Sequence, residues 1–265
     1  MAEFIVQDLY NGEIKLRFYP NSHRYKIEGE KIWRVSATAV TGIVGGEKTN
    51  LLTNWAQNQY QMALHAWLES AKEPLSKMEV EEAINKCRDA AEQEKNRTAD
   101  VGTVVHDYAE AFGLAKINGD PIPDVPEITS EQMFNGIEAF LTWVKNNEVE
   151  FIEAEKLVYS KKHGYVGTLD LLAKVNGKLT LIDYKTGKYV YDEHYYQVAG
   201  YKMAWEEEHG KVQKALILHF DRETGMLGEY PITLTECKHN QKMFLHLLAI
   251  KNDLKEKAKK KNKKK

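Results

Sequence analysis

Cysteine is scarce in this chain of 265 residues, which contains only Cys87 and Cys237. The two lie far apart, in segments predicted to be helical, and neither belongs to a Cys-x-x-Cys pair. A disulfide framework is therefore not expected, and a reducing compartment is indicated. Two cysteines also cannot supply the four thiolates of a four-cysteine iron–sulfur cluster, so we expect no cluster of this kind.

Long apolar runs are absent as well. No segment approaches the roughly 20 apolar residues that a membrane-spanning helix needs. The first residues, MAEFIVQDLYNGE, are polar and acidic and lack the pattern of a secretory signal. With 43% hydrophobic and 29% charged residues, the composition is that of an ordinary globular protein without a membrane partner.

An excess of positive charge is also lacking, because the net charge is −2. Residues 251–265 contain nine lysines against Asp253 and Glu256, a charge of +7, which leaves −9 for the rest. This distribution excludes a uniformly basic nucleic-acid binder. The lysine-rich tail has two interpretations, a solvated helix end or a non-specific phosphate-binding arm, and both stay open.

The hydrophobic pattern predicts a mixed α/β protein. Alternation over residues 3–35 predicts a β-meander, and the Pro-rich segment 119–128 predicts a loop. Thr129 and Gln132 resemble a capping box that opens the next helix. The other predicted helices are 36–43, 50–70, 79–98, 102–112, 129–147, 192–208 and one from 235, and the other predicted strands are 150–160, 165–175, 178–185, 214–220 and 228–233. We divide the chain into an N-terminal region, 1–99, a core, 100–250, and a basic tail, 251–265.

One predicted hairpin, GTLDLLAKVNGKLTLIDYKTG (167–187), places two aspartates face to face. Asn176-Gly177 is the preferred sequence of a two-residue type I′ turn. That loop pairs residues whose numbers sum to 353, so Asp170 lies opposite Asp183, with Lys185 on the same face. Like charges in this position are destabilising. A bound divalent cation would offset the repulsion, although a surface hairpin with a simple Asp–Lys ion pair remains an alternative.

Other polar residues stand at spacings that bring side chains together. His106 and Glu110 share a helix face, and so do Gln197 and Tyr201. Glu153 and Glu155 lie on one face of the strand before the hairpin. Each of these also has a structural interpretation, as a core residue or an exposed one.

In their order and spacing these elements resemble the RecB-like branch of the PD-(D/E)xK nuclease superfamily. The resemblance covers about residues 100–205. The segment VSATAVTGI, followed by Leu52-x-x-Trp55, looks like the N-terminal portion of small viral and organellar exonucleases of this branch. The matching motifs are Gly102-Thr-Val-Val-His106, Glu155, Gly167-Thr-Leu-Asp170, Ile182-Asp183-Tyr184-Lys185-Thr186-Gly187 and Gln197-x-x-x-Tyr201.

The resemblance implies a restriction-endonuclease-like core, in which helices flank a mixed central β-sheet, with the N-terminal β-meander and helices as additions. It implies Mg²⁺ or Mn²⁺ held by His106, Asp170, Asp183 and the Tyr184 carbonyl, with a metal-bound water as the nucleophile. Lys185 would position or deprotonate that water, or stabilise the transition state. Glu155, chosen over Glu153 for its distance from Asp170, would be a further contact. Gln197 and Tyr201 would hold DNA or brace Lys185.

The resemblance also implies a DNA exonuclease acting on ends or single strands, in recombination, repair or phage DNA metabolism. A cytoplasmic setting, in a bacterium or a phage-infected host, follows from the same likeness. The chain contains no helicase motif, so a recombination or replication partner would be a separate protein. The alternatives are a structure-specific endonuclease on the same scaffold and a non-catalytic DNA-binding module.

Overall fold

The computed structural model describes residues 4–44, 46–71, 76–221 and 224–262. The last lysines of the predicted tail, 263–265, and Glu223 of a predicted turn lie outside the described residues. The chain forms two compact units, one made of Met1–Ile43 with Val105–Lys265 and the other of Val44–Val104. The division into residues 1–99, 100–250 and 251–265 stays a prediction.

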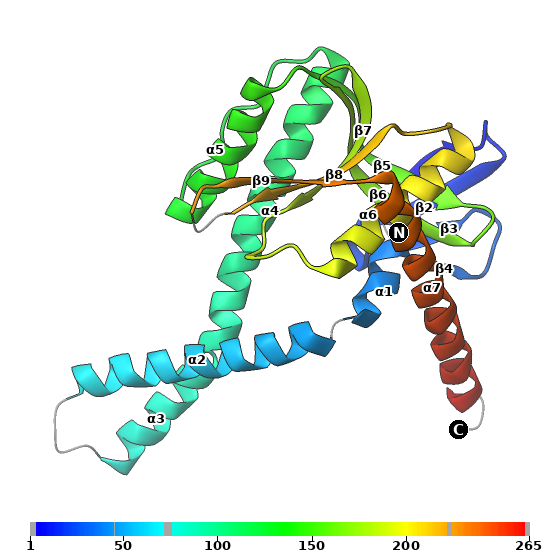
Figure 1. The fold of residues 1–265 in the computed structure, drawn as a ribbon. Coiled ribbons are helices and arrows are strands. Elements are labelled where there is room, and N and C mark those ends of the chain that lie inside the picture. Colours follow the sequence, from blue (N-terminus) through cyan, green and yellow to red (C-terminus); the bar gives the residue numbers. More distant parts are fainter. Residues whose placement is uncertain (1–3, 45, 72–75, 222–223, 263–265) are drawn as a thin grey trace. The chain divides into compact units, whose positions relative to one another are not determined.

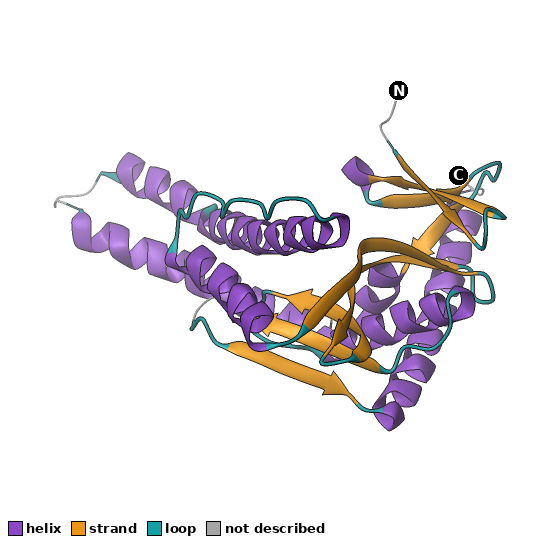
Figure 2. Ribbon diagram, turned by 90° about the horizontal axis from the view of Figure 1, so that it is seen from above, coloured by secondary structure: helices purple, strands orange, loops and turns teal. Residues whose placement is uncertain are grey.

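A mixed β-sheet is the centre of the larger unit (Figures 1 and 2). Its order is β1-β2-β3-β4-β6-β7-β8-β9, and β5 pairs with the other edge of β6. β4 runs parallel to β6 and β7 parallel to β8, whereas the other pairs are antiparallel. The strands are β1 (Ile5–Leu9), β2 (Ile14–Tyr19), β3 (Arg24–Ile27), β4 (Trp33–Ser36), β5 (Val149–Ser160), β6 (Tyr165–Val175), β7 (Lys178–Lys185), β8 (Lys214–Phe220) and β9 (Leu227–Ile232).

Helices pack on both faces of this sheet, as the fold prediction expected. On one face Val40, Val198 and Phe244 join Leu181 and Ile217 in a buried apolar cluster. These three residues come from α1 (Ala37–Thr41), α6 (Asp192–Glu208) and α7 (Leu234–Asn262). Successive residues of a strand point to opposite faces of the sheet. The strand residues next to Leu181 and Ile217 therefore face the helices on the other side.

That second layer is aromatic. It contains α5 (Glu131–Asn146) and the C-terminal part of α4 (Ala90–Asn118). The Phe140 ring of α5 meets Tyr184 and Phe220 of the sheet edge-on, with both centroid distances 6.0 Å. Phe112 of α4 packs edge-on to Phe140 at 5.3 Å. The predicted mixed α/β fold with a sheet between helices is therefore confirmed.

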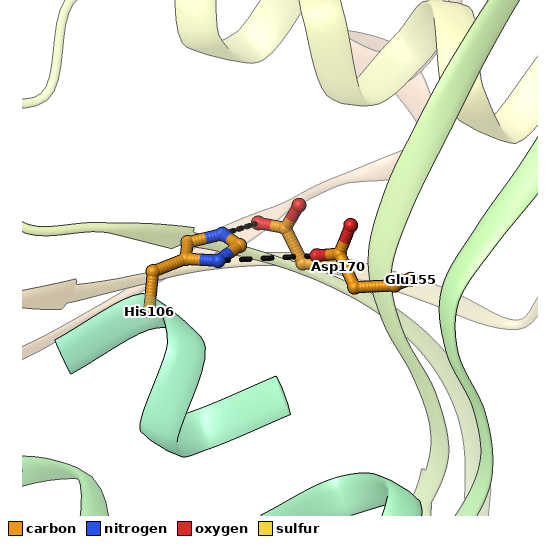
Figure 3. A group of neighbouring side chains, drawn as sticks. All are labelled: His106, Glu155 and Asp170. Carbon is orange, nitrogen blue, oxygen red and sulfur yellow. Dashed lines mark ion pairs between the residues drawn. The ribbon is translucent and has the colours of Figure 1, made fainter. Parts of the chain in front are cut away.

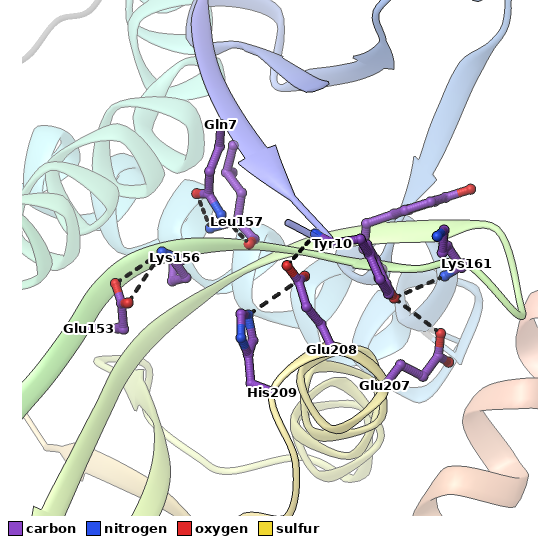
Figure 4. A network of polar contacts seen from close by, with 10 residues as sticks. Gln7, Tyr10, Glu153, Lys156, Leu157, Lys161, Glu207, Glu208 and His209 are labelled. Carbon is purple, nitrogen blue, oxygen red and sulfur yellow. Dashed lines mark hydrogen bonds and ion pairs between the residues drawn. The ribbon is translucent and has the colours of Figure 1, made fainter. Parts of the chain in front are cut away.

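The N-terminal strands are tied to the core by polar contacts near Tyr10 (Figure 4). The Tyr10 backbone N–H donates to the Glu208 carboxylate of α6, and its hydroxyl donates to the Tyr159 carbonyl at 2.8 Å. Ser160 Oγ donates to Glu207 Oε1 at 2.6 Å. These bonds join the predicted meander to β5 and α6, so its side chains have defined positions beside the core.

Three helix predictions were wrong in detail. The helix expected over 79–98 ends early, because α3 (Lys77–Arg88) has its C-cap at Asp89. The helix expected over 102–112 is longer, because α4 runs from Ala90 to Asn118 through Gly102, and one glycine costs a helix only about 1 kcal/mol relative to alanine. The N-cap of α5 is Ser130, whose Oγ accepts from Met133 N–H at 3.2 Å, and not Thr129.

The smaller unit contains α2 (Gly46–Ser70), α3 and the first part of α4. The short 3₁₀ helices Pro20–Ser22 and Gly42–Val44 complete the described elements. Across the described ranges, none of the helices is both long and apolar enough to cross a membrane.

Candidate functional site

The sheet opens along one edge of β6. β5 occupies the opposite edge of this strand along its whole length. On the open edge, β4 pairs with Tyr165 and Val166, and β7 pairs only from Leu171 onward. Residues 167–170 therefore have no strand partner on this edge within the described part of the chain. The gap lies at the Gly167-x-x-Asp170 motif.

The hairpin has the predicted register. Leu171 pairs with Ile182 and Val175 with Lys178, and both sums are 353. Asn176 and Gly177 have φ angles of 49° and 75°, as a type I′ turn requires. The paired ladder stops one step before the two aspartates. There Asp170 Oδ2 accepts a 2.7 Å hydrogen bond from the Tyr184 backbone N–H, so a carboxylate takes the place of a strand partner.

Glu155 extends this row of acids onto a third strand. Ala154 pairs with Leu171 and Lys156 with Leu169, which places Glu155 across from Asp170. The Glu155 backbone has φ of 46°, a left-handed conformation that is unusual for a non-glycine residue inside a strand. Such strain is retained where the surrounding structure imposes it, and it occurs often at functional sites.

Glu153 lies apart from this row. Its carboxylate pairs with Lys156 Nζ at 3.2 Å, and a register shift separates it from Phe151. Of the two glutamates left open by the sequence, the structure brings Glu155 to the aspartates.

His106 completes a compact group with Glu155 and Asp170 (Figure 3). Its Nε2 lies 3.3 Å from Asp170 Oδ2, and its Nδ1 lies 3.8 Å from Glu155 Oε1. One ligand atom from each residue falls within 4.8 Å of the others. His106, Asp107 and Glu110 form a second such group on the same helix.

Asp183 is not part of these close groups, although it lies in the same cleft. Its side chain is 1% exposed, and Oδ2 pairs with the Lys185 ammonium. Oδ1 has no hydrogen-bond partner among the described residues. Burial raises the pKa of Asp183 to about 6, and the charge of Asp170 adds to this, while Lys185 opposes it.

The remaining charges of the site shift one another. Burial opposes the charge on His106, but its contact with Asp170 and the charge of Glu155 prevail and raise its pKa to about 9. Burial, followed by the charge of Asp170, raises the pKa of Glu155 to about 8. Burial disfavours the Lys185 ammonium, yet Asp183 and Asp170 raise its pKa. Burial and repulsion between carboxylates thus favour the protonated forms of Glu155 and Asp183, whereas His106 and Lys185 keep the pKa of Asp170 below its usual value.

Gln197 and Tyr201 project side by side from α6, as predicted. Gln197 Nε2 donates to the Tyr201 hydroxyl at 2.6 Å and lies 3.3 Å from Thr38 Oγ1. The Tyr201 ring fills the space over Gly167, where an added Cβ would come within 2.4 Å of its Cε1. A larger residue at this point of the gap would force the Tyr201 ring to move.

All eight predicted site residues line one cleft of about 620 Å³. The N-terminal segment supplies another wall of the cleft, which includes Phe18, His23 and Tyr25. Sequence reasoning missed this wall, and it also missed Thr38 and Asp107. Thr38 lies within VSATAVTGI, but only its bond to Gln197 reveals a role.

The residues of the cleft fit a divalent cation. Asp183 Oδ1 is a buried acceptor without a hydrogen-bond partner in the described structure, and so is Glu155 Oε1 beyond its 3.8 Å ion pair. Mg²⁺ and Mn²⁺ both prefer carboxylate oxygens as ligands. Imidazole is a common ligand of transition-metal ions, the group to which Mn²⁺ belongs. The ion that binds is not identified by these groups alone.

Comparison with known proteins places the chain. No curated protein sequence matches it. Eighteen chains of solved structures do. One, described as the crystal structure of SSO0001, is 17% identical over 79% of this chain and 87% of that chain, with a TM-score of 0.34. The model of the PD-(D/E)XK nuclease superfamily matches residues 62–262, more than half of the sequence, and the chain therefore belongs to that superfamily of nucleases.

Proposed function

We propose that this nuclease is a metal-dependent DNA exonuclease of the RecB-like branch, acting on DNA ends or single strands in recombination, repair or phage DNA metabolism. One observation carries the proposal. Glu155, Asp170 and Asp183 stand in a row on adjacent strands, with Lys185 and His106 beside them. Acidic groups gathered at this density need a cation, and a cation among acids is what phosphodiester hydrolysis uses.

His106, Asp170 and Glu155 would hold Mg²⁺ or Mn²⁺, with Asp183 and the Tyr184 carbonyl as further ligands. When bound, the cation lowers the pKa of a coordinated water and offsets charge on the phosphate. The 2.7 Å bond from Tyr184 N–H keeps Asp170 Oδ2 directed into the cleft. The protein thereby fixes its acidic groups before substrate binds.

Lys185 would act as a charged donor. Asp183 and Asp170 hold its proton in place against the effect of burial. An ammonium can orient a water molecule or a phosphate oxygen, and it stabilises negative charge in the transition state. Asp183 fixes its position through their ion pair.

Gln197 and Tyr201 would bind or align the DNA strand. Their mutual hydrogen bond and the contact with Thr38 order both side chains at the edge of the cleft. Burial raises the pKa of Tyr201 well above its ordinary value, so its hydroxyl keeps the proton as a donor. A separate recombination or replication partner and a cytoplasmic setting belong to the same proposal.

The test uses linear and circular DNA, single-stranded and duplex, labelled at the 5′ or the 3′ end, with Mg²⁺, Mn²⁺ or EDTA. We expect linear DNA to be degraded and circles to survive. Lys185→Ala should lower the rate by about 100- to 1,000-fold, the usual loss when a transition-state donor is removed. Lys188→Ala is the matched control, since this lysine is exposed and does not line the cleft.

The outcomes separate the alternatives. Cleavage of circles would replace the exonuclease with a structure-specific endonuclease. Binding of DNA without cleavage under any metal condition would indicate a non-catalytic module. Cleavage that persists in EDTA, or in Lys185→Ala, would contradict the proposed mechanism.

A further inference from the structure

A second cavity, of about 410 Å³, lies where β3, β4 and α7 meet. Arg24, Arg34, Lys251 and Lys255 line it, and we call it the basic pocket. None of the described residues that line it is acidic. Two of these cations, Arg24 and Arg34, come from the N-terminal strands and the other two from the lysine-rich segment 251–265, so the fold gathers positive charge from distant parts of the chain.

Most of this positive charge is not neutralised. Arg34 pairs with Glu30, but Arg24, Lys251 and Lys255 have no ion-pair partner in the described structure. Lys255 Nζ donates to a neutral acceptor, the Trp33 carbonyl, at 2.9 Å.

The nearby acids of α7 are engaged elsewhere. Asp253 pairs with Lys257 and Glu256 with Lys259, both at 2.6 Å. The pocket therefore keeps a surplus of about three positive charges, which an anion would neutralise.

Arg24 is positioned by a ring and not by an acid. Its guanidinium carbon lies 3.8 Å from the centroid of the Trp33 ring. A cation–π contact holds a guanidinium in place and leaves its charge and donors available. An arginine stacked in this way is suited to the recognition of a phosphate.

The cations of the pocket also act on one another. Burial lowers the pKa of Lys255, and the charges of Lys259, Arg34 and Arg24 lower it further, against the opposing charge of Glu256. Nearby positive charge disfavours the charged form of a lysine, so this part of the shift reflects the cations around the pocket. A bound anion would reverse the effect.

The basic pocket adjoins the cleft of about 620 Å³ that contains the predicted site residues, which we call the nuclease cleft. His23 and Tyr25 line both cavities. Phe18 stacks on Tyr25 with ring centroids 4.8 Å apart, which gives this shared wall an aromatic surface. Because the two cavities share these residues, a strand that left the cleft on this side would reach the pocket, and aromatic side chains there could stack on its unpaired bases.

We propose that the basic pocket binds a backbone phosphate of the same nucleic-acid strand whose scissile bond lies in the cleft. The inference rests on the proposed function and adds a second contact to it. The strand carries a phosphate at every nucleotide, so one molecule can supply both the phosphate at the acidic residues and the phosphate at the pocket. The pocket would thereby set the path of the strand and not the chemistry of cleavage.

The test measures binding without cleavage, with fluorescein-labelled single-stranded DNA in EDTA over a series of salt concentrations. Lys251→Ala/Lys255→Ala is compared with Lys238→Ala/Lys242→Ala, which removes the same charge from exposed positions of the same helix. Arg24→Ala provides an independent variant, and thermal unfolding verifies the fold of each protein.

We expect the pocket variant to bind about three- to tenfold more weakly in 0.1 M salt. Its log–log salt slope should fall by about 0.7 for each phosphate contact that is lost. The control pair should change the affinity less than twofold. Equal losses in the two pairs would overturn the proposal, because they would reflect overall charge alone.

Further arms separate this proposal from the proposed function. Unchanged binding in the pocket variants, together with cleavage that needs Lys185 and metal, would remove the pocket and leave the nuclease. Inorganic phosphate, or polyglutamate at equal ionic strength, is added as a competitor. Either anion could raise the unfolding temperature of the wild type but not that of Lys251→Ala/Lys255→Ala. If the two proteins then bind DNA equally well, the pocket binds an anion other than the DNA strand, and the proposed strand contact is wrong.

Discussion

The nuclease cleft and the basic pocket share a wall at His23 and Tyr25, yet they gather charge of opposite sign. In the cleft, burial raises the pKa values of Glu155 and Asp183, and Asp183 Oδ1 finds no partner in the described structure. In the pocket, Lys255 loses proton affinity, because burial and nearby cations oppose its charge. Each region has the imbalance that a ligand of opposite charge would correct. Together they suit a substrate that meets a metal at one phosphate and cationic side chains at another.

The largest expected effect comes from replacing one carboxylate of the cleft, which should lower the rate of cleavage and leave DNA binding at the basic pocket intact. Glu155→Gln should reduce cleavage by about 100- to 1,000-fold, because Glu155 lies with His106 and Asp170. Glu153→Gln is the matched control on the same strand, since Glu153 pairs with Lys156. Initial rates with labelled DNA in Mg²⁺ provide the measurement.

DNA binding in EDTA should survive Glu155→Gln, because the basic pocket is untouched. A comparable loss of activity in Glu153→Gln would contradict the specific role of Glu155 in cleavage.

Protons should compete with the cation for the cleft. The metal-free pKa values of His106 and Glu155 are raised to about 9 and about 8. The stability that the charged His106 contributes is present below about pH 6.5 and is lost as the pH rises through 9. Glu155 also lowers the stability as the pH rises, from about pH 4.5 to 8, because the folded protein disfavours its charged form.

The metal-free protein should therefore lose stability between about pH 4.5 and 9, most steeply from about pH 6.5 to 8, where the two intervals overlap. The stabilisation by added Mn²⁺ should grow over the same interval, because binding displaces those protons. Urea unfolding with EDTA or Mn²⁺, at several pH values, measures both trends. Glu155→Gln should flatten both curves, and parallel curves with and without Mn²⁺ would contradict the assigned ligands.

A smaller effect is expected at Gly167, which packs against Tyr201 of the cleft and does not line the pocket. An alanine Cβ would lie 2.4 Å from Tyr201 Cε1, so the ring must move. Overpacking of this kind costs about 1–3 kcal/mol in the free energy of unfolding. The Gln197–Tyr201 hydrogen bond should be disturbed at the same time, which lowers cleavage.

Gly113→Ala is the control for this substitution, because its nearest Cβ contact is an ordinary 3.4 Å. Within helix α4 that change should be neutral or stabilising by up to about 1 kcal/mol. Chemical denaturation of both variants measures the difference, and equal stabilities would show that Tyr201 yields without strain.

The two regions also differ in how much of each could be read from the sequence. The hairpin of the cleft was predicted in register because alternation and the Asn176-Gly177 turn act over short distances. The left-handed Glu155 and the unpaired edge at 167–170 depend on strands β4 and β5, which come from distant parts of the chain. No local pattern reports them.

The basic pocket could not be predicted at all. Arg24 and Lys251 come from opposite ends of the sequence, and only the packing of α7 against β3 and β4 brings them to one cavity. The lysine-rich tail drew attention to the end of α7, but its earlier lysines form the pocket. The end of α3 at Asp89 was missed for a different reason, since no glycine or proline marks it.

The smallest expected effect concerns Trp33, which holds Arg24 without neutralising it. Trp33→Leu should leave the cleft unchanged and release the guanidinium, so DNA binding in EDTA should weaken by about two- to fivefold, the equivalent of the 0.5–1 kcal/mol of an exposed cation–π contact. Trp33→Phe keeps a ring at this position and should recover part of the affinity. The Lys255 bond persists in both variants, because it goes to the backbone carbonyl. Fluorescence titration at two salt concentrations distinguishes the two substitutions. If Trp33→Leu lowered the cleavage rate at saturating DNA instead of the affinity, the pocket would act on chemistry, and the separation of the two regions would fail.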